Sequence, residues 1–421
     1  MIRQRSGWRA SRPLIDRPPK IERLLWTTWV IGIVALLGVL LGLQSLHGGH
    51  LGALAEYDDG VYFDASIALV HGIAPYRDFV LLQPPLITVW LAPWAAIGSV
   101  TSQAFGFELA RLATDVVPLV SVLLVALVTR HRGLTRSLVA TGTTALSIGT
   151  IHASQTVLIE PYLVVMCLGG LLALGIGQRH SPSNARVAFA GVLFGLAGAT
   201  KVWAIIPVAV LLWRMPDATA TKRIRFSAGV ALGFLIGAGP FILLAPQRAI
   251  LDFVITQAIR GPSGMDLPAR LADLAGSHLL VLLAGLRSPL GAITAVIVVL
   301  GGAVMVVRAM KGNTVQLSTR EEDRLLRTLA GVVGIILVAT PAYYYHYSAF
   351  FAPFLGLALS TLPQPTPLRP TSETGSSRTT HQGRAFLMHA LVAVLVAGYL
   401  AGDVVGVVRP VVENRPVPTR P

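Results

Sequence analysis

Long apolar runs recur along almost the whole of this 421-residue chain. A helix needs about 20 mostly apolar residues to cross a bilayer, and several of the runs reach that length. The composition agrees, with 53% hydrophobic and 13% charged residues, where soluble domains carry about 25% charged residues. The sequence therefore predicts an all-α polytopic membrane protein.

We expect about 11 transmembrane helices, with boundaries that are uncertain by a few residues. They fall at residues 26–45, 109–129, 137–152, 156–176, 187–200, 202–214, 227–246, 289–308, 327–341, 346–362 and 386–407. The run 85–98 is apolar but short and proline-rich, so we expect it to lie along the membrane interface rather than to span it. Counting it as a span would invert the orientation of every later helix.

The basic residues test this topology. With the N-terminus in the cytoplasm, 24 of the 34 Lys and Arg residues fall in cytoplasmic segments. Such a bias across short loops is the positive-inside pattern. It also explains the net charge of +14 through anionic lipid headgroups, so we expect no nucleic-acid partner. The predicted location is the plasma membrane, multi-pass.

The topology divides the chain into a few regions. A basic cytoplasmic N-terminus (1–25) precedes a transmembrane module (26–362), with a large first outer loop (46–108) and a second (247–288). A Pro/Ser/Thr-rich cytoplasmic linker (363–385), a final span (386–407) and a tail (408–421) follow. The N-terminus lacks a small-residue cleavage site and is not expected to be a cleaved signal. Cys167 is the single cysteine, so no disulfide forms within the chain.

Asp58 and Asp59 are adjacent acids just after the first span. They are either two surface acids of a solvated loop or part of a reaction site at the membrane surface. Adjacent carboxylates are costly to desolvate in so apolar a chain unless they have a use.

Further polar groups gather on the same predicted membrane face, which suggests one cavity at the outer leaflet. Glu160 begins an apolar helix, where the helix dipole alone favours an acid, but burying a carboxylate calls for a partner cation or substrate. Lys201 either snorkels to the headgroups or contacts a phosphate. His346 lies in the run YYYHY, which is either an interfacial aromatic belt or a hydrogen-bonding site for sugar or phosphate.

The chain carries no phosphate-binding loop, no HExxH and no GxSxG motif. No cytoplasmic domain is large enough to bind a nucleotide. An activated donor that reaches the outer face would then be carried by a lipid.

Four segments, in this order, resemble the polyprenyl-phosphate-sugar-dependent glycosyltransferases of the C-type fold, which include protein O-mannosyltransferase-like enzymes and lipid A aminoarabinose transferases. They are the first outer loop EYDDGVYFDASIALVHGIAPYRDFVLLQPPLITVWLAPW, the run LIEPYLVV, the run AGVLFGLAGATKVWAIIPVAVLL and the run YYYHYSAFFAPFLGLAL. They span about residues 26–360. Some relatives have Lys before the Pro-Pro pair, where this chain has Gln83. The large C-terminal soluble domain of oligosaccharyltransferases is missing.

The resemblance implies transfer of a sugar from a polyprenyl phosphate to an acceptor hydroxyl outside the cytoplasm, with inversion. Asp58 is the expected base, Asp59 its neighbour, and Glu160 would bind acceptor hydroxyls or orient the base. The residues expected to bind substrate are Lys201, His346, Tyr345, Tyr76, Arg77 and Gln83, with Arg248, Arg260 or Arg270 as further cations for the lipid phosphate. The co-substrate is the lipid-linked sugar, and no cofactor or metal site is predicted because no third ligand for the acid pair has convincing spacing.

Two other functions fit the same spans. A transporter or flippase for a lipid-linked sugar predicts charges near the membrane midplane and repeated halves. An O-antigen-type polymerase or ligase would lack the acid pair after the first span. The sugar is open among mannose, arabinose, glucose and galactose, and the acceptor among a glycan, a lipid and a protein.

Overall fold

The computed structural model describes residues 20–46, 50–54, 56–178, 181–215, 219–276 and 317–362. The predicted spans 289–308 and 386–407, the linker, the tail and most of the basic N-terminus lie outside the described residues. The division into regions and the number of spans therefore stay predictions.

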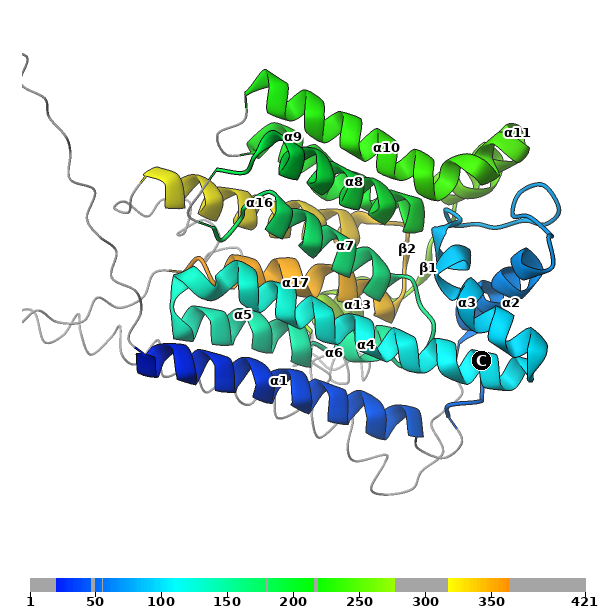
Figure 1. Cartoon of the computed structure of the whole chain (residues 1–421), viewed down its shortest axis with the longest axis horizontal. Helices are drawn as coiled ribbons and strands as arrows, with labels where there is room; N and C mark the ends of the chain where they lie inside the picture. The colour runs from blue at the N-terminus through cyan, green and yellow to red at the C-terminus, as the bar shows by residue number, and fades with distance from the viewer. Residues whose placement is uncertain are drawn as a thin grey trace, which may run out of the picture.

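The described chain is a bundle of roughly parallel and antiparallel helices (Figure 1). Its first half comprises α1 (Lys20–Leu46), α2 (Tyr57–Val70), α3 (Leu86–Val100), α4 (Gln103–Thr129), η2 (Arg130–Arg132), α5 (Leu134–Leu146), α6 (Ile148–Ala153), α7 (Glu160–Ala173), α8 (Asn184–Thr200), η3 (Val202–Ala204) and α9 (Ile205–Arg214). The second half comprises α10 (Ala220–Leu244), α11 (Pro246–Ala249), the π-helix η4 (Ile250–Ile255), α12 (Thr256–Ala258), β1 (Ser263–Gly264), α13 (Leu267–Leu274), α16 (Leu317–Ala339), β2 (Ala342–Tyr343), η5 (Tyr345–Tyr347) and α17 (Ser348–Leu359).

Three of the described helices are long and apolar enough to cross a membrane: Lys20–Leu46, Gln103–Arg132 and Ala220–Leu244. Shorter apolar helices fill the bundle between them, at Leu86–Val100, Glu160–Ala173, Asn184–Thr200 and Val202–Arg214. The prediction of an apolar helical protein is confirmed. The span predicted at 137–152 is divided into two helices, α5 and α6. Between them the backbone of Ser147 is extended (φ −62°, ψ 133°), which interrupts the helix.

The helices begin where polar side chains cap them. Ser102 accepts a hydrogen bond from the backbone of Phe105 at 3.2 Å, and Ser183 caps α8 in the same way. Thr219 caps α10 through the backbone N–H of Lys222 (3.3 Å). A side-chain oxygen at this position satisfies one of the N–H groups that a helix start leaves unpaired.

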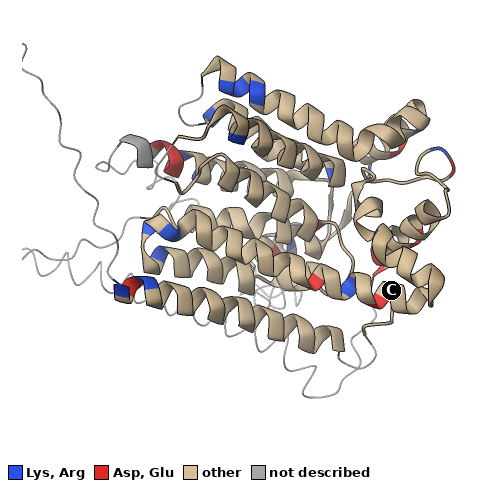
Figure 2. Cartoon of the chain, in the orientation of Figure 1, with Lys and Arg blue, Asp and Glu red and all other residues tan. Residues whose placement is uncertain are grey.

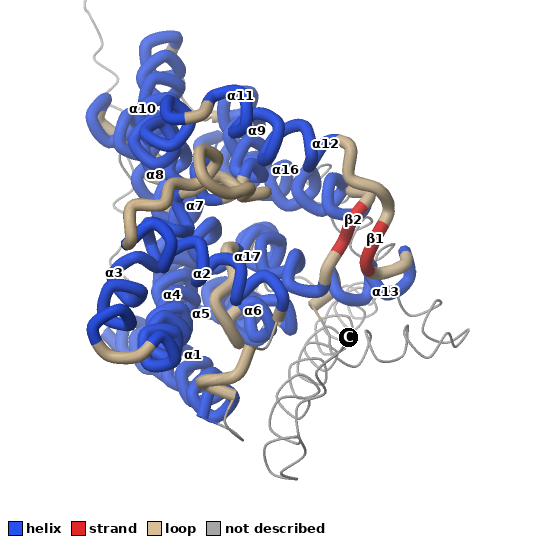
Figure 3. The backbone as a smooth tube through the Cα atoms, turned by 90° about the vertical axis from the view of Figure 1, so that its right-hand side faces the viewer, coloured by secondary structure: helices blue, strands red, loops and turns tan. Residues whose placement is uncertain are grey.

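The first predicted outer loop contains two helices, and both lie at one end of the bundle, which we call the α2–α3 end (Figure 1). The predicted interfacial run 85–98 is α3. Helix α2 begins beside the acid pair, and Gly72 follows it with a φ of +80° that suits glycine. The segments from η4 to α12 and the parallel pair β1–β2 also lie there, and α13 packs further into the bundle against α16 and α17; Figure 3 views the bundle from this end.

Helices α8 and α10 touch backbone to backbone. A Cβ added at Gly195 would lie 2.2 Å from the carbonyl oxygen of Val230, and one at Gly229 would lie 2.2 Å from that of Ala188. Small residues permit such close packing of membrane helices. The contact fixes the end of α8, and with it Lys201, the residue that follows.

Candidate active site

Glu160, Lys201 and His346 meet in the interior of the α2–α3 end. Glu160 is the first residue of α7, Lys201 follows α8, and His346 lies in η5. The Lys201 Nζ is 2.5 Å from Glu160 Oε1, and His346 Nε2 is 3.7 Å from the same oxygen. Their exposed fractions are 0% for Glu160, 3% for Lys201 and 7% for His346. Three residues that are far apart in the sequence thus form one buried charged cluster, which we call the Glu160 cluster.

Two aromatic rings complete the surroundings of Lys201. Its Nζ lies 3.8 Å from the centroid of the Trp203 ring and 4.3 Å from that of Tyr347. A ring face attracts a cation through its quadrupole, so the ammonium is held by one carboxylate and two rings. A compact cation can serve as a point-charge contact for an anion.

Two buried polar atoms of the Glu160 cluster have no hydrogen-bond partner among the described residues: Glu160 Oε2 and His346 Nδ1. A buried polar atom without a partner costs stability. Such atoms are places where a polar ligand or a water can bind.

Asp59 is also fully buried, and its Oδ2 makes several contacts within the protein. Its Oδ2 lies 3.1 Å from Arg111 Nη2, accepts a hydrogen bond from the Thr156 hydroxyl, and accepts one from the backbone N–H of Glu56 at 3.3 Å. The last bond belongs to a reciprocal capping box between Glu56 and Asp59 at the start of α2. Asp59 therefore holds the beginning of α2 in place.

Asp58 has a different environment. It is half-buried, and the Tyr62 hydroxyl donates a long hydrogen bond of 3.5 Å to its Oδ2. Burial raises the pKa of Tyr62 well above its ordinary value, and the charges of Asp58 and Glu160 raise it further. Tyr62 is thus within reach of the charges of both Asp58 and Glu160. The two adjacent acids differ in their contacts, since Asp59 binds Arg111 and Thr156 and Asp58 contacts Tyr62.

The tyrosines just before His346 contact the start of α2 and Arg260. Tyr345 donates a hydrogen bond to Glu56 Oε1, and burial together with that bond raises its pKa. Arg260 Nη2 donates to the Tyr344 hydroxyl at 3.0 Å. Of the three arginines predicted beside Lys201, the structure brings Arg260 to the residues next to His346.

Arg248 and Arg270 are engaged in other contacts. Arg270 Nη1 donates to the carbonyl oxygens of Val338 and Thr340, both at 2.7 Å. Arg248 Nη1 donates to the carbonyl oxygen of Arg77 at 3.0 Å.

Tyr76, Arg77 and Gln83 form a separate group in the loop between α2 and α3. The buried Tyr76 donates from its hydroxyl to the carbonyl oxygen of Gln83 at 2.7 Å, and its backbone has a positive φ of 66°. Arg77 is exposed and pairs with Asp78 at 2.7 Å, which lowers the pKa of that carboxyl. These contacts brace the loop, and the predicted roles of the three residues in substrate binding stay predictions.

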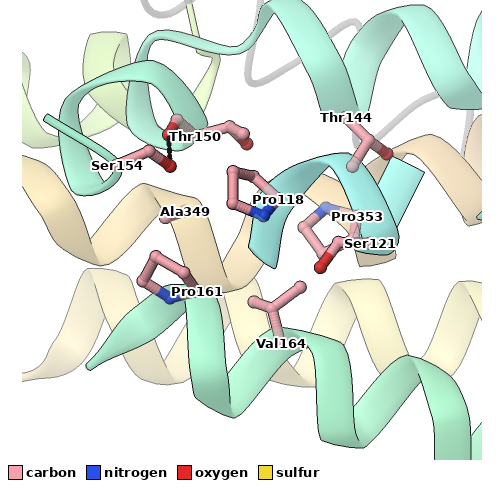
Figure 4. Close-up of a pocket in the computed structure, with 9 residues that line it drawn as sticks. All are labelled: Pro118, Ser121, Thr144, Thr150, Ser154, Pro161, Val164, Ala349 and Pro353. Carbon is pink, nitrogen blue, oxygen red and sulfur yellow. Dashed lines mark hydrogen bonds between the residues drawn. The ribbon is translucent and has the colours of Figure 1, made fainter. Parts of the chain in front are cut away.

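A small cavity lies in the bundle beside the first turn of α7, with Pro161, the residue after Glu160, in its wall (Figure 4). Its volume of about 20 Å³ suits about one water molecule. Its lining residues are Pro118, Ser121, Thr144, Thr150, Ser154, Pro161, Val164, Ala349 and Pro353. Four of them carry hydroxyl groups, but three of these donate to backbone carbonyls, and the surface of the cavity is mostly apolar.

Sequence reasoning missed Arg111, Thr156 and Tyr62 as parts of the site. Arg111 was counted only as a basic residue of the outer side, although an arginine within an apolar helix itself signals a buried partner. Thr156 and Tyr62 carry no such signal. In the described ranges, no group of three or more His, Cys, Asp and Glu side chains is arranged to hold a metal ion.

Comparisons with known proteins show a likeness in structure. No family model and no curated protein matches the chain. The crystal structure of ArnT from Cupriavidus metallidurans bound to undecaprenyl phosphate superposes with a TM-score of 0.58 at 16% identity, over 92% of this chain and 71% of that one. The apo structure of the same protein gives 0.55 at 17% identity, over 87% and 63%. The chain therefore has the fold of ArnT, an aminoarabinose transferase of the C-type glycosyltransferase fold, as the resemblance in sequence implied.

Proposed function

We propose that this chain is a membrane glycosyltransferase that moves a sugar from a polyprenyl-phosphate donor to a hydroxyl of a cell-envelope acceptor, with inversion at the anomeric carbon. The observation that carries the proposal is the buried Glu160 cluster within a C-type glycosyltransferase fold. The undecaprenyl phosphate bound to ArnT supports a lipid phosphate as the carrier.

Lys201 is the proposed contact for the phosphate that leaves. The reaction needs positive charge there rather than a proton donor, because a phosphate is a stable anion. Lys201 is 3% exposed, and a charge shielded from water acts more strongly on a nearby anion than one in solvent. Glu160, at 2.5 Å from the Lys201 Nζ, holds this ammonium in place.

Asp58 is the proposed general base. Asp59 Oδ2 already serves Arg111, Thr156 and the backbone of Glu56, whereas Asp58 accepts one long hydrogen bond, from Tyr62. Asp58 takes the proton of the acceptor hydroxyl as the acceptor oxygen attacks the anomeric carbon. The bond from that carbon to the phosphate oxygen breaks, and the polyprenyl phosphate leaves with the electron pair.

His346 and Tyr345 are proposed to bind the sugar or the phosphate. His346 Nδ1 is buried without a partner among the described residues, so a ligand hydroxyl or phosphate oxygen would satisfy it. Tyr345 lies beside it, with the ring centroids 5.4 Å apart.

We place the α2–α3 end outside the cytoplasm. Support comes from the basic residues of the described ranges, most of which lie near the opposite end of the bundle (Figure 2). By the positive-inside rule that opposite end would face the cytoplasm.

The proposal is tested with the purified full chain and undecaprenyl-phosphate-linked arabinose, mannose, glucose and galactose in turn, with cell-envelope extract as the acceptor source. We expect sugar transfer and release of undecaprenyl phosphate with at least one donor. Movement of intact donor across a vesicle membrane without release would instead favour a flippase. Transfer only from a diphosphate-linked glycan would favour a polymerase or ligase.

A further inference from the structure

Arg111 lies near the beginning of α4 and is fully buried, with 0% of its surface exposed. Its guanidinium is 4.6 Å from the centroid of the Phe107 ring. Burying an arginine is costly unless its donors are satisfied. Its contacts therefore show what the chain uses it for.

The guanidinium binds three backbone carbonyls of the segment between α1 and α2. Its Nη1 donates to the carbonyl oxygens of His50 and Leu51 (the latter at 2.7 Å), and its Nη2 donates to that of Ala53 at 2.6 Å. Neutralising the charge would need only a carboxylate. Three carbonyls around one planar fork instead fix the path of the segment that leads to α2.

The same guanidinium joins the start of α2, which carries Asp58 and Asp59, to the segment before α7, which begins with Glu160. On one side its Nη2 contacts Asp59 at 3.1 Å, and Asp59 is the residue after Asp58. On the other side its Nε and Nη2 donate to the Thr156 hydroxyl at 3.3 and 2.9 Å, and Thr156 lies four residues before Glu160. The Thr156 hydroxyl in turn donates to Asp59, which closes the network.

We propose that Arg111 is the positioning residue of the active site. It fixes the start of α2 against the segment before α7 and thereby sets where Asp58 lies relative to Glu160 and Lys201. The inference rests on the proposed function, because it assumes that Asp58 acts on the substrate. Arg111 itself contacts no reacting group.

The first test is Arg111→Lys, which keeps the charge but loses the planar fork. Misplacing a reacting group by about 1 Å can lower a rate by about 10²-fold. The donor is whichever of the four undecaprenyl-phosphate-linked sugars the wild type turns over fastest. With it, we expect kcat to fall about 10- to 100-fold, while the KM for that donor changes less than about threefold. Binding of undecaprenyl phosphate alone should persist.

Arg132→Lys is the matched control, since Arg132 is also a buried arginine, with an exposed fraction of 9%, and lies at the opposite end of the bundle. It should lower the unfolding temperature and leave the kcat of the folded protein unchanged. An equal loss of kcat in both variants would overturn the positioning role, because any damaged buried arginine would then have the same effect.

A double-mutant cycle shows whether Arg111 acts through Asp58. If it does, Asp58→Asn should cost far less in the Arg111→Lys background than in the wild type, since the aspartate is already misplaced. Fully multiplicative losses would contradict the proposal. If Asp58→Asn alone leaves kcat unchanged, the proposed base is wrong, and the proposal for Arg111 fails with it but for that separate reason.

Thr156 provides the same test without removing a buried charge, should Arg111→Lys fail to fold. Thr156→Val removes the hydroxyl that joins Arg111 to Asp59 and should lower kcat with little change in KM. Thr156→Ser keeps the hydroxyl and should restore kcat to within about threefold of the wild type. Equal activity of the two variants would overturn the inference.

Discussion

Arg132 and Lys201 are buried cations at opposite ends of the same bundle, and their surroundings differ. Arg132 pairs with Glu322 and Asp323, both at 2.5 Å, and the side chains of these acids are 15% and 20% exposed. Lys201 pairs with Glu160, whose side chain is fully buried. Water reaches the acids in the first case and not in the second.

Under the proposed function, the difference is one between a structural use of charge and a chemical one. The Arg132 network joins the turn after α4 to α16 and ties helices together near solvent. Among the described residues, each network leaves buried polar atoms without partners: Arg132 Nε in the first, and Glu160 Oε2 and His346 Nδ1 in the second. Only in the Glu160 cluster is the carboxylate itself fully buried, with one of its oxygens left unpaired. That is an expensive arrangement, and the binding of a polar ligand would relieve it. The following substitutions test this contrast, beginning with the largest expected effect.

Lys201→Met should be the most damaging change, because it leaves Glu160 charged and buried without its cation. Breaking a buried pair in this way costs about 3–5 kcal/mol of unfolding free energy. The double variant Glu160→Gln/Lys201→Met should recover most of the stability in thermal unfolding but none of the transferase activity. A double variant as active as the wild type would remove the pair from the site.

Glu322→Gln should have a smaller effect at the opposite end. It weakens the charged hydrogen bond to Arg132, and such bonds contribute about 1.5–3 kcal/mol. The unfolding temperature should fall, while kcat of the folded protein stays the same. A loss of kcat without a loss of stability would show that the two ends are coupled in function.

Asp273, in α13, should make the stability of the chain depend on pH. It is buried and accepts a hydrogen bond from Tyr343 at 2.6 Å, and burial raises its pKa to about 7. The folded chain therefore holds this proton more tightly than the unfolded chain, whose aspartate titrates near its ordinary pKa of about 3.9. The stability contribution is present below that value and is lost as the pH rises through about 7.

Thermal unfolding between pH 5 and 8 tests this directly. The wild type should lose about 2–3 kcal/mol of stability across this range, and Asp273→Asn should show a shallower slope. Identical slopes in the two proteins would mean that Asp273 does not titrate in this window.

Arg77→Ala should have the smallest effect, since Arg77 is exposed and its pairing with Asp78 is a surface contact. Exposed pairs contribute little to stability, because solvent screens the two charges. The unfolding temperature should hardly change. A rise of more than about tenfold in the KM for the donor would show that Arg77 binds substrate, as the sequence predicted.

Some of this arrangement was readable from the sequence. Apolar periodicity and length predicted the helices, and the cost of burying charge singled out Glu160 and Lys201 separately. That they pair with each other depends on the close crossing of α8 with α10 and on the meeting of α7 with α8, which no local pattern encodes. The two residues are 41 positions apart.

The neighbours Asp58 and Asp59 show the same limit at short range. The sequence treats them as one acidic pair, but successive helical residues point about 100° apart, so one carboxylate meets Arg111 and the other does not. Glu56 and Asp59 have capping-box spacing, although glutamate is not a favoured N-cap residue. The role of Arg111 required the path of residues 50–53, which is irregular and has no periodicity to predict.

The turnover of Asp58→Asn tests the central claim most directly, with Asp64→Asn as its control because Asp64 is an exposed aspartate on the same helix α2. Both variants are compared with the wild type for release of undecaprenyl phosphate from the active donor, after their folding and their binding of undecaprenyl phosphate have been matched. We predict that kcat falls about 10²- to 10⁴-fold in Asp58→Asn and is unchanged in Asp64→Asn. Turnover of Asp58→Asn within about threefold of the wild type would contradict the account.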